Sequence, residues 1–360
     1  MRFGSGKQRQ PSTGSKRTFS NADWDGMCDV VIIGAGPVGL ACGIEAKRNG
    51  LDAVIVDKGA LTNSLQGYPL NMEFFSTPEL LEIGGHPFPT LRYKPTRQET
   101  LEYYRRVALQ EDLRLRLYER VLEVNGQSGA FTVVTQKGAI TCRKVVVATG
   151  FFDIPNRLDV PGENLPNVTH YYREPFPYFR QRVAVIGAKN SAAKVALECY
   201  RHGATVTLIH RGSGLSDRIK YWILPDIVNR IKEGSITAYF NTKVVAIEPD
   251  RLVLDTPDGR VEIENDWVLA MTGYRPDYSF LTTLGITIGD DPARTPKHDS
   301  ETFETNRRGL YLAGTVCGGL RTSRWFIENG RFHAGQIMQH ITYGTVEPLA
   351  LQQRVWKTAE

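Results

Sequence analysis

The sequence predicts an α/β protein with two domains, each built around a parallel β-sheet. Residues 29–59, DVVIIGAGPVGLACGIEAKRNGLDAVIVDKG, and residues 182–212, RVAVIGAKNSAAKVALECYRHGATVTLIHRG, follow one plan. Each has a short β-branched run, a glycine-rich turn, an amphipathic helix and a second β-branched run, which is a βαβ unit with parallel strands. Because the plan recurs only after about 150 residues, it indicates two domains and not a solenoid.

The segments outside these units predict how the two domains are connected. A helix is expected over about 97–110, followed by three short strands, and the proline-rich, polar segment 153–177 is expected to cross to the second unit. Four further short strands form a meander after the second unit. The last part, from about Tyr274, contains GLYLAGTV and a helix near 327–341 but no glycine-rich unit. We therefore expect it to return to the first domain, so that the second domain is inserted in the first.

The two ends of the chain predict tails. Residues 1–28 carry five Lys or Arg against two Asp and are rich in Ser, which is typical of a disordered basic tail. The expected boundaries are a tail over 1–28, the first domain over 29–155 and 273–345, the second domain over 156–272 and a C-terminal tail over 346–360.

Composition excludes several classes of protein. The chain is 41% hydrophobic and 23% charged, which is ordinary for a globular protein. No apolar run approaches the roughly 18 residues of a membrane span, so we expect no membrane association. The net charge of +5 is concentrated in the N-terminal tail, and no basic stripe indicates nucleic acid as a partner. The N-terminal residues have no apolar core of a secretory signal, so the cytoplasm is the expected compartment.

The five cysteines show no motif. They include no Cys-x-x-Cys pair and no zinc-ligand spacing, so neither a contiguous redox dithiol nor a metal site is expected.

The first glycine-rich turn predicts a dinucleotide site of the Rossmann type. Gly34 makes the tight turn, Gly36 lets a pyrophosphate approach the backbone and Gly39 lets helix and strand pack closely. The helix that follows offers free N–H groups to the phosphates. Asp57 ends the next strand, where an acid accepts hydrogen bonds from ribose hydroxyls.

The second turn is degraded but still predicts a dinucleotide. Gly187 opens it, whereas Lys189 and Ala192 occupy the other glycine positions, and Asn190 and Ser191 can supply contacts of the N-cap type. The position that corresponds to Asp57 holds His210, followed by Arg211. An arginine pairs with a 2′-phosphate that an acid would repel, so this site is expected to bind NADPH.

Beyond these units, longer segments carry a family resemblance. IIGAGPVGL, EFFSTPELLEIGG, VVVATGFFDIPNRLDVPGE, VIGAKNSA, IKYWILP, AMTGYRPDYSFL, FETNRRGLYLAG and FIENGRFHAG extend over nearly the whole chain outside the tails. The sequence resembles the thioredoxin-reductase-like flavoproteins, and within them the bacillithiol disulfide reductase family. This resemblance implies two Rossmann-like domains of the three-layer ββα type, FAD in the first and NADPH in the second. It also implies a homo-oligomer, a dimer or a tetramer.

Two departures from these families concern thiols. Thioredoxin reductases carry a Cys-x-x-Cys in the NADPH domain, and this chain has none. Bacillithiol disulfide reductases carry a cysteine directly after the proline of the first turn, and here Val38 follows Pro37.

A third departure concerns the flavin contact. Thr315 stands where thioredoxin reductases usually have an aspartate that bonds the flavin ribityl chain, and a hydroxyl can make a similar, uncharged contact.

Two residues are candidates for catalysis. Cys42 lies one helical turn after Val38 on the same helix face, and His333 lies in the family-like FIENGRFHAG block. Each also fits an ordinary role, Cys42 as a small core residue and His333 as a structural side chain.

The expected cofactor-binding residues extend over both units and over the segments that resemble the flavin site. They are Gly34, Gly36, Pro37, Val38, Gly39, Asp57, Lys58, Tyr68, Asn71, Phe75, Ala148, Thr149, Gly150, Gly187, Lys189, Asn190, Ser191, Ala192, His210, Arg211, Gly314, Thr315 and Phe332.

These features together predict an NADPH-dependent FAD oxidoreductase. The resemblance favours a small-molecule disulfide as the electron acceptor. The missing cysteine keeps two alternatives open: a reductase that passes electrons to a small carrier protein such as ferredoxin or flavodoxin, and an enzyme similar to flavin monooxygenases.

Overall fold

The computed structural model describes residues 26–346. The predicted C-terminal tail lies outside this range except for its first residue. The predicted N-terminal tail lies outside it except for residues 26–28, and Cys28 already belongs to the first strand.

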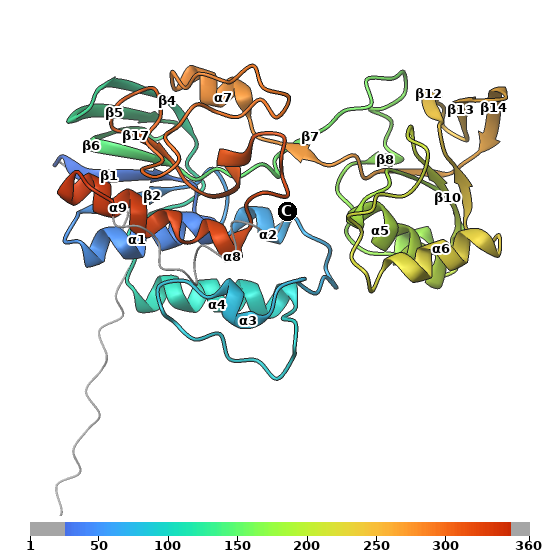
Figure 1. Cartoon of the computed structure of the whole chain (residues 1–360), viewed down its shortest axis with the longest axis horizontal. Coiled ribbons are helices and arrows are strands. Elements are labelled where there is room, and N and C mark those ends of the chain that lie inside the picture. Colours follow the sequence, from blue (N-terminus) through green and yellow to red (C-terminus); the bar gives the residue numbers. More distant parts are fainter. Residues whose placement is uncertain (1–25, 347–360) are drawn as a thin grey trace, which may run out of the picture.

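The first domain is built on a seven-stranded sheet of order β3-β2-β1-β6-β5-β4, with β17 paired to β6. Strands β1, β2, β3 and β17 are parallel to their neighbours, whereas β4, β5 and the start of β6 form an antiparallel meander. Helices α1 and α9 pack against each other below this sheet (Figure 1). The elements are β1 (Cys28–Ile33), α1 (Pro37–Arg48), β2 (Ala53–Val56), α2 (Asn63–Gln66), α3 (Pro78–Leu81), α4 (Arg97–Gln110), β3 (Leu115–Arg116), β4 (Val121–Gln127), β5 (Ala130–Thr135), β6 (Gly138–Val147), α7 (Tyr278–Thr283), β17 (Leu310–Leu312), the 3₁₀ helix η2 (Gly314–Gly318), α8 (Ile327–Gly330) and α9 (His333–Tyr343).

The second domain has a parallel sheet of order β11-β10-β9-β15-β8 and a separate antiparallel sheet β12-β13-β14. Its βαβ unit is β9-α5-β10, and α5 and α6 cover one face of the parallel sheet (Figure 1). The elements are β8 (Val168–Thr169), the 3₁₀ helix η1 (Phe176–Tyr178), β9 (Arg182–Ile186), α5 (Asn190–Arg201), β10 (Thr205–Ile209), α6 (Leu224–Lys232), β11 (Thr237–Tyr239), β12 (Lys243–Ile247), β13 (Arg251–Thr256), β14 (Gly259–Glu264) and β15 (Trp267–Ala270).

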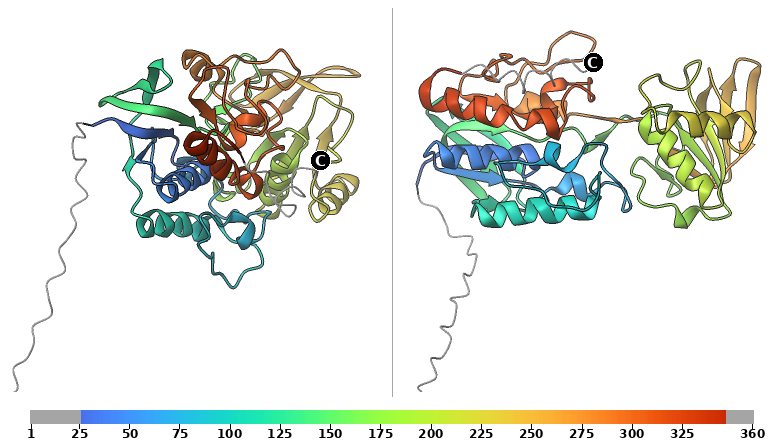
Figure 2. Two further views of the ribbon diagram at one scale, coloured as in Figure 1. Left: turned by 60° about the vertical axis from the view of Figure 1, so that its left-hand side comes forward. Right: turned by 60° about the horizontal axis from the view of Figure 1, so that its bottom comes forward.

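The chain crosses between the domains twice, and the two crossings pair with each other. Strand β7 (Ile154–Pro155) leads into the second domain, and β16 (Tyr274–Arg275) leads back as its antiparallel partner. The return of β17 to the first sheet confirms the prediction that the second domain is inserted in the first. Figure 2 shows the two bodies side by side with this narrow connection between them.

Local sequence explains the elements that position the sites. The strands β1 and β9 are almost wholly buried, which is typical of parallel strands covered on both faces. Pro37 occupies the first turn of α1, where no intrahelical N–H partner is lost. Helix α4 begins and ends where the sequence predicts, and a capping box of Thr96 and Glu99 fixes its start.

Two local predictions were wrong. The helix expected near 327–341 is interrupted at Arg331 and Phe332, so that α8 and α9 are separate helices. The fourth strand of the expected second meander, β15, leaves the antiparallel sheet and pairs in parallel with β9. The second error concerns tertiary pairing, which short apolar runs do not reveal. In the described part of the chain no helix is long and apolar enough to cross a membrane.

Candidate functional site

The first glycine-rich turn connects β1 to α1 and depends on close backbone packing. Gly34 has φ of +117°, and a Cβ there would lie 2.5 Å from the carbonyl oxygen of Ala148. A Cβ on Gly39 would lie 1.8 Å from the carbonyl oxygen of Gly34. A Cβ on Gly36 would meet nothing within 4 Å. Gly34 and Gly39 are thus required by the fold, whereas Gly36 leaves open space in front of the start of α1.

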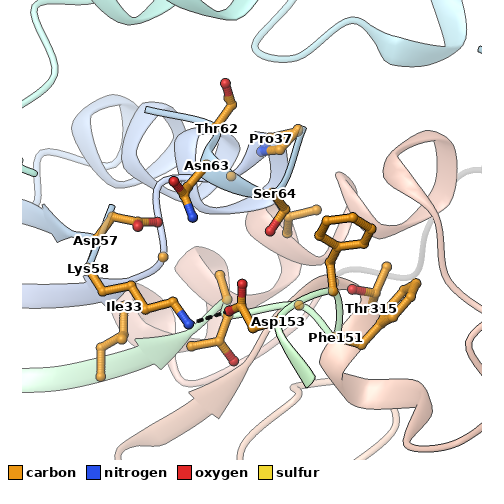
Figure 3. Close-up of a pocket in the computed structure, with 18 of the residues that line it drawn as sticks. Ile33, Pro37, Asp57, Lys58, Thr62, Asn63, Ser64, Phe151, Asp153 and Thr315 are labelled. Atoms are coloured by element: carbon orange, nitrogen blue, oxygen red, sulfur yellow. Dashed lines mark ion pairs between the residues drawn. The ribbon is translucent and has the colours of Figure 1, made fainter. Parts of the chain in front are cut away.

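Asp57 follows β2 and is fixed by the backbone around the turn. Its Oδ2 accepts a hydrogen bond of 2.7 Å from the Ala35 N–H, and its Oδ1 accepts one of 2.8 Å from the Gly59 N–H. Burial raises the pKa of this carboxyl, although both hydrogen bonds act in the opposite direction. Its neighbour Lys58 forms an ion pair of 2.6 Å with Asp153 (Figure 3).

An elongated pocket begins at these residues and extends along the carboxyl ends of β1, β2 and β6. In Figure 3, Asp57 and Lys58 lie at one end, and Phe151 and Thr315 lie at the other. Twelve of the expected cofactor residues line it: Gly34, Gly36, Pro37, Val38, Asp57, Lys58, Tyr68, Ala148, Thr149, Gly150, Gly314 and Thr315. A long pocket with an acid at one end and a hydroxyl at the other fits an extended dinucleotide.

Some lining residues lie outside the sequence prediction. Thr62, Asn63 and Ser64 at the start of α2 line the pocket, as do Asp277 and Phe280 from the region of α7. The polar run after Lys58 was a usable signal for the first group. No local signal identifies the second, because α7 reaches the pocket only after the chain has returned from the second domain.

Four of the residues expected at the first cofactor do not line this pocket: Gly39, which packs against the Gly34 carbonyl, and Asn71, Phe75 and Phe332. Asn71 is exposed, and Phe332 precedes α9 with the guanidinium of Arg331 over its ring. Phe75 is turned away from the pocket and packs against the apolar cluster of the second domain. The loop that carries Asn71 and Phe75 therefore touches the pocket through Tyr68 and not through these side chains.

None of the five cysteines, all of which lie in the described part of the chain, lines the pocket. Val38 packs against Gly314, where an added Cβ would lie 3.0 Å from Cγ2 of Val38. Cys42 and Cys317 are fully buried behind this contact, and burial raises the pKa of both thiols. The other three cysteines are buried as well.

His333 lies behind the pocket and not in it. Its Nδ1 accepts a hydrogen bond of 3.1 Å from the Gly314 N–H, and its ring stacks on Phe303 with centroids 3.9 Å apart. Trp325 packs edge-on against the same ring. Since Gly314 lines the pocket, this histidine can fix the position of the Gly314 turn, but its own side chain does not reach the interior of the pocket.

The second glycine-rich turn has the same architecture, with an alanine at its third position. Gly187 has φ of +137°, and a Cβ there would lie 2.6 Å from the carbonyl oxygen of Met271 and 3.1 Å from Cβ of Ala192. Lys189 is the N-cap residue of α5, and no side chain caps this helix. The expected N-cap type contact is therefore wrong for Asn190, whose side chain bonds the backbone of Arg218 and Lys220.

Basic side chains follow β10 as expected. His210 is half-buried, and burial lowers its pKa, with smaller contributions from the charges of Arg211 and Lys189. Arg211 is exposed beside it, and Ser191 is exposed on the first turn of α5. A phosphate bound here would meet positive charge and the free N–H groups of α5, so the residues fit a phosphorylated dinucleotide.

Comparison with known proteins gives matches over nearly the whole chain. A family model described as pyridine nucleotide-disulphide oxidoreductase matches residues 31–314. Bacilliredoxin reductase Bdr of Bacillus subtilis (strain 168) is 42% identical over 313 residues, which cover 86% of this chain and 96% of that protein. The solved bacillithiol disulfide reductase of Staphylococcus aureus superposes with a TM-score of 0.85 at 40% identity, covering 89% of this chain and 99% of the other.

More distant matches include other activities. A ferredoxin–NADP reductase of Streptococcus pneumoniae serotype 2 (strain D39 / NCTC 7466) is 24% identical over 298 residues, which cover 80% of this chain and 86% of that protein. A mutant of a flavin monooxygenase from Stenotrophomonas maltophilia superposes with a TM-score of 0.72 at 25% identity, covering 88% of this chain and 98% of the other.

Proposed function

The chain belongs to the pyridine nucleotide-disulphide oxidoreductase family, and we propose that it reduces a low-molecular-weight disulfide with electrons from NADPH. The observation that carries this proposal is the 42% identity, over 86% of this chain, to a protein named bacilliredoxin reductase. The predicted family, the fold class and the cofactors FAD and NADPH are confirmed by these comparisons. The chain is therefore an NADPH-dependent flavoprotein oxidoreductase.

We assign FAD to the elongated pocket of the first domain. Asp57 would hold the ribose hydroxyls, the Gly34–Gly36 turn would face the pyrophosphate, and Thr315 would bond the ribityl chain at the far end. NADPH is assigned to the second turn, with His210 and Arg211 on its 2′-phosphate. FAD, when bound, supplies hydride acceptance and two-electron transfer, and the residues around it supply position and charge.

The proposed reaction takes NADPH, a proton and a disulfide to NADP⁺ and two thiols. We propose that no cysteine of this chain takes part. Val38 supplies no nucleophile at the pocket, and the raised pKa values of Cys42 and Cys317 keep both buried groups as thiols. His333 then acts as a positioning residue, because it holds the Gly314 turn from behind.

One observation favours a second candidate. A pocket without a thiol also suits a reductase that hands electrons to a carrier protein, and ferredoxin–NADP reductases are among the relatives. Such an enzyme needs no covalent contact with its acceptor.

Steady-state consumption of NADPH separates the two. We expect bacillithiol disulfide or a related small disulfide to accelerate NADPH oxidation by the holoenzyme and to yield free thiols, and ferredoxin or flavodoxin to have little effect. The Cys42→Ala and Cys317→Ala variants should keep this activity. Rapid turnover with a carrier protein and none with disulfides would replace the proposal by the second candidate.

A further inference from the structure

Five side chains from both domains meet where the domains face each other. Phe75 and Lys94 come from the first domain, and Lys194, Lys220 and Trp222 come from the second. We call this group the junction cluster. The loops on either side approach each other beside α2 and α5 in two different views (Figure 1, Figure 2). The cluster therefore lies at the interface of the two domains and outside both glycine-rich turns.

Backbone pairing builds the first-domain half of the junction cluster. Glu73 and Thr96 form an antiparallel β-bridge, and the Phe74 N–H donates to the Pro95 carbonyl over 2.9 Å. This pairing holds Phe75 beside Lys94 and aims both at the second domain.

Helix α5 and the loop before α6 build the second-domain half. Lys194 lies one turn into α5, and the side chain of Asn190 on the same helix accepts a 2.9 Å hydrogen bond from the Lys220 N–H. The Trp222 ring meets the Phe75 ring edge-on with centroids 5.9 Å apart. Lys220 is thereby anchored to α5, and Trp222 closes the cluster across the interface.

Three ammonium groups surround the two rings. Nζ of Lys94 lies 3.5 Å from the centroid of Trp222, Nζ of Lys194 lies 5.8 Å from that of Phe75, and Nζ of Lys220 lies within 6 Å of both. In the part of the chain that the structure describes, the lysines that form ion pairs are Lys47 and Lys58. Each of these three ammonium groups thus lies close to an aromatic ring.

This positive charge is incompletely balanced. Burial lowers the pKa of Lys194, whereas the charges of Glu198 and Glu73 raise it and that of Lys94 lowers it by less, so two acids face the three lysines. Glu73 is also shared with Arg92 through an ion pair of 3.3 Å. Like charges that gather at a partly buried site favour the binding of an anion.

The loop that carries Phe75 of the junction cluster also reaches the flavin pocket. The loop that carries Phe75 lines the pocket through Tyr68, and Phe74 contacts the Tyr68 ring with centroids 6.3 Å apart. Ser76, the next residue along the chain after Phe75, donates a 2.8 Å hydrogen bond to Glu328. Glu328 follows Ile327, which lines the pocket. One loop, which carries both Tyr68 and Phe75, thus connects the pocket to the cluster.

We infer that the junction cluster binds the carboxylates of the electron acceptor, so that the enzyme prefers disulfides that carry negative charge. This inference rests on the proposed function and adds the chemical class of the substrate. The 2′-phosphate of NADPH has its own basic residues, His210 and Arg211, at the end of β10. The cluster lies on another part of the domain, toward the first domain that holds the flavin pocket.

Two small disulfides that differ in charge test the inference. Dithiodipropionate carries a carboxylate on each arm, and hydroxyethyl disulfide has neutral arms of similar length. We expect kcat/KM of the holoenzyme to be about tenfold or more higher for dithiodipropionate, and added salt to reduce only this value. The double variant Lys194→Gln and Lys220→Gln should bring the two acceptors close to equality, and the double Arg variant should retain the preference. Lys232→Gln, an exposed lysine of α6, is the matched control and should behave as the unmodified protein.

Separate outcomes overturn the inference. If the Gln variants lower kcat/KM equally for both disulfides, the cluster only holds the domains together. If they raise KM for NADPH and leave the preference intact, the cluster belongs to the NADPH site. If neither disulfide is reduced at all, the proposed function fails, and calorimetric titration of the oxidised holoenzyme with dithiodipropionate decides the inference. Saturable binding that the Gln variants abolish supports the anion site, and absence of binding contradicts it.

Discussion

At the scale of single residues, charge at the end of the second strand distinguishes the two nucleotide units. Asp57 ends the first unit and is held by two backbone N–H groups, whereas His210 and Arg211 end the second. Sequence alone could identify these residues, because Asp57 and His210 follow the first glycine of their units by the same number of residues. It could not place Phe75, whose direction depends on contacts with the second domain, or Phe332, which lies at the break between α8 and α9.

Arg211→Ala tests the assignment of the 2′-phosphate. A charged hydrogen bond contributes about 1.5–3 kcal/mol, so we expect KM for NADPH to rise roughly 10- to 100-fold. KM for NADH should hardly change, because that cofactor has no 2′-phosphate. Steady-state kinetics with both nucleotides measures this, and Arg260→Ala on β14 serves as an exposed control in the same domain. Equal effects on the two nucleotides would refute the assignment.

At the scale of elements, short-range signals were sufficient wherever a helix or strand carries its own cap or pattern. Both ends of helix α4 were predicted from the sequence, and in the structure a capping box of Thr96 and Glu99 fixes its start. The break between α8 and α9 was missed, because Phe332 and His333 are compatible with a continuous helix. His333 begins α9 directly after this break and contacts Gly314 and Phe303. Only the tertiary structure shows these contacts.

Thr96→Ala tests the contribution of the capping box to stability. The Thr96 side chain accepts a hydrogen bond from the Glu99 N–H, and Glu99 in return accepts one from the Thr96 N–H. Removing the hydroxyl should lower the free energy of unfolding by about 1 kcal/mol. Urea unfolding followed by circular dichroism measures this change. Gln98→Ala, an exposed position in the same turn, should have little effect, and a Thr96 variant no less stable than that control would show that the box does not matter.

At the scale of the whole molecule, the repeated βαβ plan predicted two domains, and the absence of a third glycine-rich unit after Tyr274 predicted that the second domain is inserted in the first. The paired strands β7 and β16 show how the chain enters and leaves the inserted domain at one place. What the sequence could not reveal is which surfaces of the domains meet. The junction cluster combines residues 75, 94, 194, 220 and 222, and no periodicity or motif links positions so far apart. Its assembly depends on the orientation of two separately folded bodies.

The central claim is that NADPH on the second domain reduces FAD on the first, which then reduces a disulfide. Anaerobic stopped-flow absorbance of the holoenzyme tests it most directly. We predict that NADPH bleaches the visible flavin band much faster than NADH at equal concentration, and that a small disulfide added next restores the band and releases two thiols for each flavin. A flavin that NADPH leaves oxidised, or that stays reduced in the presence of every disulfide, would contradict the account.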